Sequence, residues 1–246
     1  MSGGAGTDRP LAGVLLVDKP EGPTSMTVCR RVRRALVAGG APKRVKVGHG
    51  GTLDPLATGL LVVLIGRATR LCERVMAGTK RYVAGVDLSR TSTTDDREGE
   101  QRTVEVEPLE RARVEAALGG FRGTIVQRPP AHSAMKVGGR RAYELARRGE
   151  AVELEPRPVR IDAIELTAYE WPIATIDVTC GKGTYIRSLA RDLGGALGAG
   201  GMLVSLRRLS TGPFDVSGAT PLDGLPGVLT GDDLLEPPGS DGSAGG

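Results

Sequence analysis

The chain has few aromatic residues, few cysteines and only two histidines. Aromatic residues make up 3% of its 246 residues, so aliphatic side chains and alanine must fill the core. The three cysteines, Cys29, Cys72 and Cys180, are far apart and form no C-x-x-C pair. This spacing argues against a structural zinc site or a disulfide framework. Each cysteine is expected to be a small buried apolar residue.

Long hydrophobic runs and cofactor motifs are also missing. No run of 18 or more apolar residues occurs, so no membrane span is expected. Residues 1–10 lack the apolar centre of a signal peptide, which leaves the cytoplasm as the expected compartment. The sequence contains no P-loop, no dinucleotide-binding motif and no zinc motif. Their absence fits a reaction that needs no cofactor and no metal, which is what the family resemblance described below implies.

The two signs of charge are unevenly distributed. Residues 217–246 contain five acidic residues and no Lys or Arg, so the net charge of +4 for the whole chain leaves +9 on residues 1–216. A body this basic favours a polyanionic partner, with binding that weakens as salt rises. Ordinary solvated charge is the simpler alternative.

Hydrophobic patterns predict an α+β fold with a mixed, largely antiparallel sheet and flanking helices, because strands and helices do not alternate regularly. Thr24 or Ser25 is placed to cap the first helix, whose inner face carries Val28, Val32 and Leu36. We expect a loop at 90–102 and a hairpin of the strands 159–169 and 173–180. The other expected strands are 14–17, 60–65, 81–88, 124–127 and 203–209, and the helices are 24–37, 68–76, 109–118, 142–148 and 184–197.

Composition divides the chain into three segments. Residues 1–10 are Gly-rich and polar and are predicted to be disordered. Residues 11–216 are predicted to form one folded domain. Residues 217–246 form an acidic tail rich in Gly, Pro and Ser and are predicted to be largely disordered.

The most informative stretch is residues 46–61, which combines a short strand, a glycine-rich loop and an apolar run. Asp54 is the only acidic residue in it, and Pro55 restricts its backbone toward an extended conformation. A lone carboxylate in a rigid, basic neighbourhood suits chemistry on an anionic substrate. On local chemistry alone, a surface turn in which Asp54 bonds backbone amides is the favoured interpretation.

The stretch from Gly48 to Gly59 resembles the catalytic motif of the bacterial tRNA pseudouridine-55 synthases, G-H-x-G-x-L-D-P-x-A-x-G. Four further segments resemble the same family in the same order: 13–20, 80–82, 182–187 and 206–208. The resemblance covers roughly residues 11–213, so residues 11–216 are the expected pseudouridine synthase catalytic domain. Many members of this family carry a small C-terminal RNA-binding module, and residues 217–246 are too few and too low in complexity to form one. The resemblance implies the pseudouridine-synthase fold and isomerisation of uridine to pseudouridine at position 55 in the T-loop of tRNA.

The resemblance also implies roles for individual residues. Asp54 is the expected nucleophile, and Arg187 is expected to pair with it and hold it ionised and oriented. Tyr82 matches the tyrosine that lies against the target base. Tyr185 and Leu206 match positions that line the uracil pocket, although a core role suits Leu206 nearly as well. The remaining expected substrate contacts are His49, where the base leaves the RNA, and Asp95, for which Asp96 is an alternative.

Because a base inside a folded loop is not accessible, the resemblance implies base flipping. The reaction breaks a C–N glycosidic bond and forms a C–C bond; whether Asp54 attacks the base or the sugar stays open. The expected partner is the T-arm stem-loop of tRNA, with no membrane and no protein partner, and the expected state is a monomer. The alternative function is a tRNA-binding chaperone or an inactive RNA-binding scaffold on the same fold.

Overall fold

The computed structural model describes residues 11–131, 136–137, 140–141 and 154–238. The chain divides into two compact units: unit 1 comprises residues 1–77 and 211–246, and unit 2 comprises residues 78–210. Each unit mixes helices with largely antiparallel strands, which confirms the predicted α+β class. The predicted disorder of residues 1–10 and the predicted helix 142–148 lie outside the described residues.

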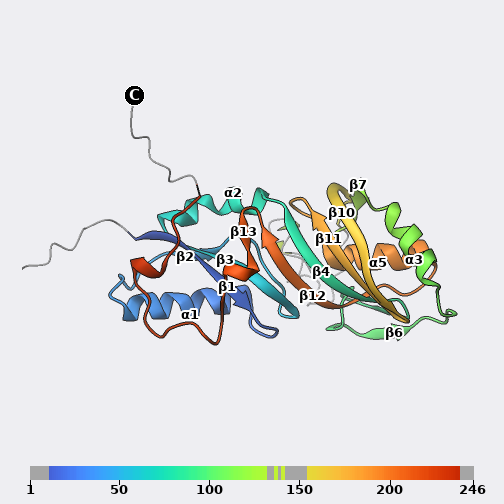
Figure 1. Cartoon of the computed structure of the whole chain (residues 1–246), viewed down its shortest axis with the longest axis horizontal. Helices are drawn as coiled ribbons and strands as arrows, with labels where there is room; N and C mark the ends of the chain where they lie inside the picture. The colour runs from blue at the N-terminus through green and yellow to red at the C-terminus, as the bar shows by residue number, and fades with distance from the viewer. Residues whose placement is uncertain (1–10, 132–135, 138–139, 142–153, 239–246) are drawn as a thin grey trace, which may run out of the picture. The chain divides into compact units, whose positions relative to one another are not determined.

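Unit 1 is built on two aliphatic strands, β1 and β3 (Figure 1). Their antiparallel register pairs Val14 with Leu64 and Asp18 with Leu60. Alternate residues of β3 point to opposite faces, and residues 60–65 are fully buried, so both faces of the strand are covered. The elements of unit 1 are β1 (Ala12–Lys19), α1 (Ser25–Ala38), β2 (Val47–His49), β3 (Ala57–Gly66), η1 (Arg67–Leu71), α2 (Cys72–Ala77), β13 (Phe214–Asp215), η2 (Val216–Gly218), β14 (Thr220–Pro221) and η3 (Gly231–Asp233).

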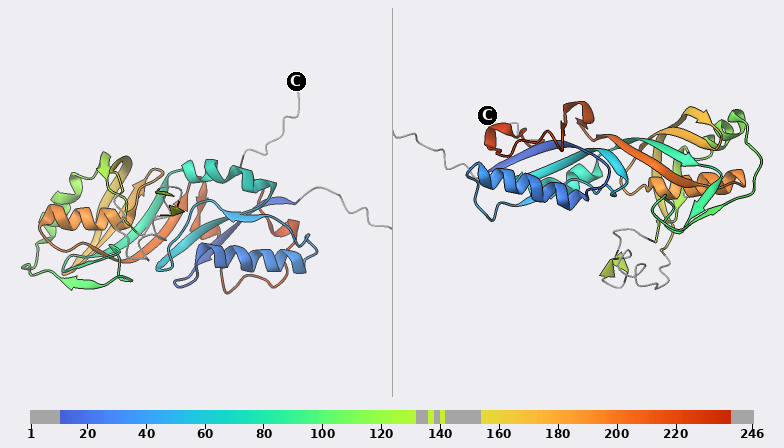
Figure 2. Two further views of the ribbon diagram at one scale, coloured as in Figure 1. Left: turned by 180° about the vertical axis from the view of Figure 1, so that it is seen from behind. Right: turned by 90° about the horizontal axis from the view of Figure 1, so that it is seen from below.

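Helix α1 begins and ends where the sequence predicts. The Thr24 hydroxyl accepts a hydrogen bond from the Thr27 N–H at 3.1 Å, and Gly39 is the C-cap. The predicted inner face is buried, while Arg30, Arg31, Arg33 and Arg34 are exposed. Figure 2 shows α1 and α2 on opposite sides of the β1 and β3 strands. The predicted helix 68–76 is a 3₁₀ turn, η1, followed by α2.

The predicted disorder of residues 217–246 is wrong for residues 217–238. This C-terminal segment, red in Figure 1, runs beside β1 and α1. Thr220 and Pro221 pair in parallel with Val17 and Asp18, and the Leu229 N–H donates to the Ala35 carbonyl at 3.0 Å. Its apolar residues are spaced irregularly among Pro and Gly, so no periodic pattern reveals that they are core residues. Leu222, Leu225 and Leu229 are nevertheless buried, which places the domain boundary beyond residue 216.

Because its leucines are buried, the C-terminal segment should contribute to the free energy of unfolding of unit 1. We expect Leu229→Ala to lower the free energy of unfolding by about 3 kcal/mol, because it leaves a cavity at a fully packed site. The matched control is Val228→Ala, since the Val228 side chain is 55% exposed; its effect should stay within about 0.5 kcal/mol. Urea titration followed by circular dichroism measures both. Equal stability of the two variants would contradict the integral role of this segment.

Unit 2 contains a sheet with the strand order β12-β4-β11-β10-β7. The predicted hairpin is present as β10 and β11, which pair antiparallel, and β11 pairs β4 with Tyr82 opposite Val178. Helix α3 packs against β10 and against α5; Figure 2 shows these helices from two sides. The elements are β4 (Lys80–Asp87), β5 (Arg90–Ser92), β6 (Gln101–Thr103), α3 (Arg111–Gly119), β7 (Gly123–Gln127), β8 (Lys136–Val137), β9 (Arg140–Arg141), β10 (Arg157–Glu170), β11 (Ile173–Cys180), α5 (Ile186–Leu197) and β12 (Met202–Thr211).

The predicted loop 90–102 is wrong at both ends. Residues Arg90–Ser92 and Gln101–Thr103 form an antiparallel pair, β5 and β6, joined by a turn that contains Asp95 and Asp96. These strands are largely exposed and carry charged residues, so they lack the apolar alternation that signals a half-buried strand. Within the described ranges, no helix has the length and apolar character that a membrane crossing needs.

Candidate active site

Asp54 lies in unit 1, in the turn that connects β2 to β3, and is half-buried. Its carbonyl accepts a hydrogen bond from the Ala57 N–H at 3.1 Å, which closes the turn. The glycines before it allow close packing: a Cβ on Gly50 would lie 2.4 Å from Cγ1 of Val75, and Gly51 has a φ of +127°. The predicted glycine-rich loop is therefore a tight turn set against α2.

Two buried side chains hold the residues on either side of Asp54. Ser25 is 2% exposed, and its hydroxyl both accepts from the Leu53 N–H at 2.9 Å and donates to the Leu53 carbonyl at 3.0 Å. The Lys19 ammonium is fully buried and donates to the Pro55 carbonyl at 3.3 Å. It also donates to the carbonyls of Pro20 and Pro23, at 2.8 and 3.0 Å. Lys19 thus supports the backbone of this turn, and the rigid anchoring on both sides fixes the position of the Asp54 backbone.

His49 ends β2 opposite Val63 and is half-buried. Its carbonyl accepts from the Cys72 thiol at 3.4 Å, which ties β2 to the start of α2. His49 and Asp54 therefore belong to one continuous segment of unit 1, as the motif predicts. The catalytic role of either residue stays a prediction.

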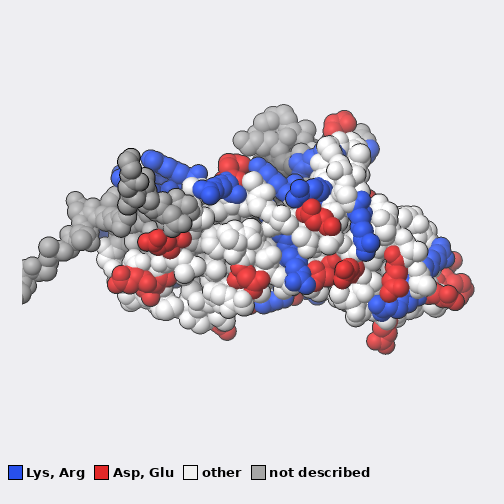
Figure 3. Space-filling model, turned by 45° about the horizontal axis from the view of Figure 1, so that its top comes forward, with Lys and Arg blue, Asp and Glu red and all other residues white. Residues whose placement is uncertain are grey.

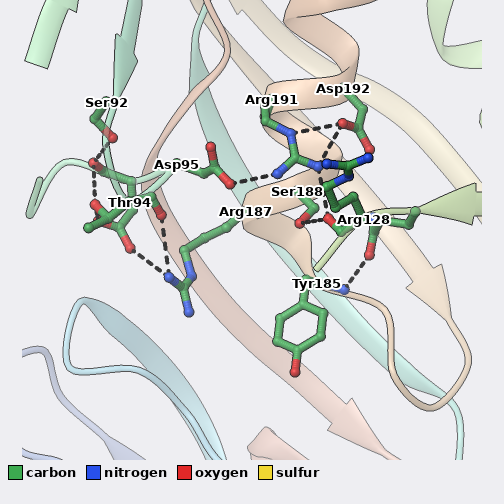
Figure 4. A network of polar contacts seen from close by, with 11 residues as sticks. Ser92, Thr94, Asp95, Arg128, Tyr185, Arg187, Ser188, Arg191 and Asp192 are labelled. Atoms are coloured by element: carbon green, nitrogen blue, oxygen red, sulfur yellow. Dashed lines mark hydrogen bonds and ion pairs between the residues drawn. The ribbon is translucent and has the colours of Figure 1, made fainter. Parts of the chain in front are cut away.

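In unit 2, Arg187 lies in the first turn of α5 and is 6% exposed (Figure 4). Its Nη1 lies 3.5 Å from Oδ2 of Asp96 and donates to the Thr94 carbonyl at 3.3 Å. Asp96 is itself 2% exposed, and its Oδ1 accepts from the Thr94 hydroxyl at 2.5 Å and from the Glu98 N–H at 3.0 Å. Ser92 also donates its hydroxyl to the Asp96 carbonyl. A buried guanidinium is thus held by a buried, hydrogen-bonded carboxylate.

Asp95 faces a different arginine. Its Oδ2 accepts from Nη1 of Arg191 at 2.9 Å, one helical turn beyond Arg187. Burial raises the pKa of Asp95 above its ordinary value, and the guanidinium groups of Arg191 and Arg187 oppose this shift. Of the two acids that the sequence leaves open, Asp96 is the one beside Arg187. A role for Asp95 in substrate binding stays a prediction.

Tyr185 is the N-cap residue of α5 and is fixed by two residues that the sequence does not single out. Its N–H donates to Oε1 of Gln127, a side chain that is 1% exposed, at 2.9 Å. The guanidinium carbon of Arg157 lies 5.4 Å from the centre of the Tyr185 ring, and its Nη2 donates to the Gly183 carbonyl at 2.8 Å. Neither Gln127 nor Arg157 belongs to a segment that resembles the family motifs, so only the fold reveals them.

Tyr82 and Leu206 lie on β4 and β12, which are neighbours in the sheet of unit 2, and both are half-buried. Unit 2 therefore contains Tyr82, Tyr185, Arg187, Leu206 and the two acids of the β5–β6 turn. Asp54 and His49 belong to unit 1. The predicted pairing of Arg187 with Asp54 joins residues of different units and stays a prediction.

The chain resembles known proteins over most of its length. Residues 39–186 match the family described as TruB family pseudouridylate synthase, N-terminal domain. The tRNA pseudouridine synthase B of Gluconacetobacter diazotrophicus is 48% identical over 217 residues, which cover 87% of this chain and 69% of that protein. The protein of the same name from Corynebacterium diphtheriae is 44% identical over 222 residues, covering 87% of this chain and 72% of that protein.

Two solved structures share the fold. A chain in the crystal structure of a Cbf5-Nop10-Gar1 complex is 32% identical with a TM-score of 0.62, over 82% of this chain and 50% of that chain. A chain of an H/ACA RNP bound to a substrate RNA containing 2′-deoxyuridine is 28% identical with a TM-score of 0.63, over 86% of this chain and 51% of that chain. This chain thus spans about half the length of those two. Since the family match covers more than half of the sequence and the relatives are closely similar, the chain belongs to the TruB family of pseudouridylate synthases.

Proposed function

We propose that this protein isomerises uridine to pseudouridine at position 55 in the T-loop of tRNA. The observation that carries the proposal is the Asp54 turn, which holds the complete family motif and is fixed on both sides by Ser25 and Lys19. Family membership and the shared name of the curated relatives support the same activity. The reaction takes place in the cytoplasm, where its substrate is found.

The proposed reaction is an isomerisation, so substrate and product have the same composition and no co-reactant is needed. The bond between N1 of uracil and C1′ of the ribose breaks, the base turns, and C5 bonds to C1′. The proton on C5 leaves, and N1 gains one. Asp54 acts as the nucleophile in its ionised form.

The remaining predicted residues have supporting roles in this proposal. Arg187 stabilises the Asp54 carboxylate, and Tyr82 offers its ring to the flipped base and its hydroxyl for proton transfer. Tyr185 and Leu206 line the uracil pocket, and His49 contacts the RNA where the base leaves the stack. The enzyme works as a monomer on the T-arm stem-loop.

Release of tritium from C5-labelled uridine in a T-arm stem-loop tests this function. The proposal expects tritium to be released in proportion to the pseudouridine formed, with no added metal or cofactor. Tight binding of the stem-loop without tritium release would instead favour the alternative, a tRNA-binding chaperone or inactive scaffold.

Exposed basic residues of unit 1 are the proposed contacts for RNA phosphates. Lys43, Arg44 and Lys46 precede β2, and Arg67 and Arg70 lie on η1; all five are exposed. The backbone joins these segments, since the Gly66 N–H donates to the Lys46 carbonyl at 2.8 Å. In Figure 3, basic side chains gather over the region of η1 and α2. These side chains could therefore contact several phosphates along one stretch of the RNA backbone.

We therefore expect the affinity for a T-arm stem-loop to fall steeply with salt, because each phosphate that the protein neutralises releases counterions. Replacing Lys43, Arg44 and Lys46 with Gln should reduce the slope of log Kd against log salt by about one for each phosphate that the variant no longer neutralises. Fluorescence anisotropy at several salt concentrations measures the slope. Replacing the exposed Arg111 and Arg122 of unit 2 with Gln is the control. The same slope in the triple variant and in wild type would contradict a phosphate-binding role for these three residues.

A further inference from the structure

The guanidinium of Arg191 connects three segments of unit 2 (Figure 4). From α5, its Nη1 donates to Oδ2 of Asp95 at 2.9 Å, in the β5–β6 turn. Its Nη2 donates to the carbonyl of Arg128, just beyond β7, at 2.9 Å. Its Nε donates to Oδ1 of Asp192 at 3.0 Å, so all three nitrogens of the guanidinium are used. One side chain thus fixes the helix to the turn and to the end of a strand.

The turn places two consecutive carboxylates against two arginines of the helix. Arg187 and Arg191 are four residues apart and lie on the same side of α5. Asp96 faces Arg187 and Asp95 faces Arg191. Asp95 and Asp96 are consecutive in the turn, so the backbone between them connects the two ion pairs.

Asp95 needs support in this conformation. Its φ of +61° is the only positive φ of a non-glycine residue in the described part of the chain, and such a backbone is strained for an L-residue. The surrounding backbone is pinned to β12: the Leu203 N–H donates to the Asp95 carbonyl at 3.0 Å, and the Arg97 N–H donates to the Leu203 carbonyl at 3.1 Å. The bond to Arg191 fixes the side chain of the same residue.

We propose that Arg191 is a positioning residue for the isomerisation: by holding Asp95 and the Arg128 carbonyl, it keeps Asp96 in place against Arg187. The side-chain hydrogen bonds of Arg191 go to Asp95, Arg128 and Asp192, so its link to the Arg187–Asp96 pair passes through Asp95. Ser188 strengthens the same arrangement, because its buried hydroxyl donates to the Arg128 carbonyl at 2.8 Å. The kinetic test of this inference rests on the proposed function, whereas the structural test does not.

The test compares Arg191→Gln, Arg191→Lys and Asp95→Asn on a T-arm stem-loop, below the melting temperature of each variant. We expect Arg191→Gln to lower kcat by about ten-fold through a small displacement of Arg187, with KM and RNA affinity within about three-fold of wild type. Arg191→Lys should recover part of the decrease, because an ammonium can still reach Asp95 but cannot span both partners. Adding Asp95→Asn to Arg191→Gln should cost little more, since both changes remove one link.

Arg113→Gln is the matched control. Arg113 of α3 donates to the Leu197 carbonyl, at the other end of α5, at 2.9 Å. A purely structural role for Arg191 would give the two glutamine variants the same kcat, and that result would overturn the proposal. So would full additivity of Arg191→Gln and Asp95→Asn.

A crystal structure of the Arg191→Gln variant gives a readout that does not depend on activity. The proposal expects the 3.5 Å distance between Arg187 Nη1 and Asp96 Oδ2 to lengthen, or the pair to adopt more than one conformation. An unchanged pair would overturn the proposal, even if the wild-type protein proved inactive on T-arm RNA. Inactivity of the wild-type protein would instead count against the proposed function.

Discussion

Asp54→Asn is expected to abolish pseudouridine formation while leaving the affinity for T-arm RNA within about three-fold of wild type. An amide keeps the size and shape of the side chain but cannot act as an anionic nucleophile, so kcat should fall by roughly 10³-fold or more. The backbone of the turn should not change, because its anchors are the carbonyl of Pro55 and the backbone of Leu53. Tritium release measures the rate, and anisotropy measures binding.

The control for this variant is Asp223→Asn. Asp223 lies in the C-terminal segment of unit 1 and is exposed. Its variant should have wild-type kcat. If Asp54→Asn turned over at a rate comparable to that of Asp223→Asn, the proposed role of Asp54 as the nucleophile would be wrong.

Arg187→Lys should lower kcat by about 10²-fold. The Arg187 guanidinium has a fixed place, because Asp96 and the Thr94 carbonyl hold its Nη1 from one side. Lysine retains the charge but presents a single ammonium, which cannot contact these groups and a second carboxylate with the geometry of a planar fork. Single-turnover kinetics at saturating enzyme isolates the chemical step from binding.

Arg111→Lys is the control, since Arg111 is an exposed arginine that pairs with Glu115 on α3. Its kcat should not change. Wild-type turnover by Arg187→Lys would contradict the role of the guanidinium. A structure bound to RNA in which Arg187 lies more than about 4 Å from the Asp54 carboxylate, outside ion-pair distance, would contradict the proposed pairing.

Periodicity predicts the regular elements of this fold well. The uninterrupted aliphatic residues of β3 signal a strand that is covered on both faces, and the spacing of Val28, Val32 and Leu36 signals a helix with one buried face. Local chemistry also identifies the ends of α1, because Thr24 and Gly39 are residues that caps favour. These features are determined by residues that are close together in the sequence, so they can be predicted from the sequence alone.

The failures occur where the partner is distant in sequence or where a strand remains exposed. Leu222 and Leu229 look like parts of a low-complexity tail, and only their packing against β1 and α1 makes them core residues. The charged strand β5 has no apolar pattern, since it pairs with β6 and remains exposed. Composition alone therefore underestimates how much of the chain is folded.

The candidate site shows the same division. The motifs find Asp54 and Arg187, but they leave Asp95 and Asp96 as alternatives because the two acids are adjacent. The structure separates them, since adjacent residues in a turn point toward different arginines of α5. Nothing in the sequence marks Arg191, whose partners Asp95 and Arg128 are 96 and 63 residues away.

The most direct test of the proposed function is to incubate the purified protein with a whole unmodified tRNA and to map pseudouridine at every uridine position. We predict pseudouridine at position 55 alone, the same product in an isolated T-arm stem-loop, and none with Asp54→Asn. Pseudouridine at other positions would contradict this function, as would its absence from position 55 with a folded protein that binds the RNA.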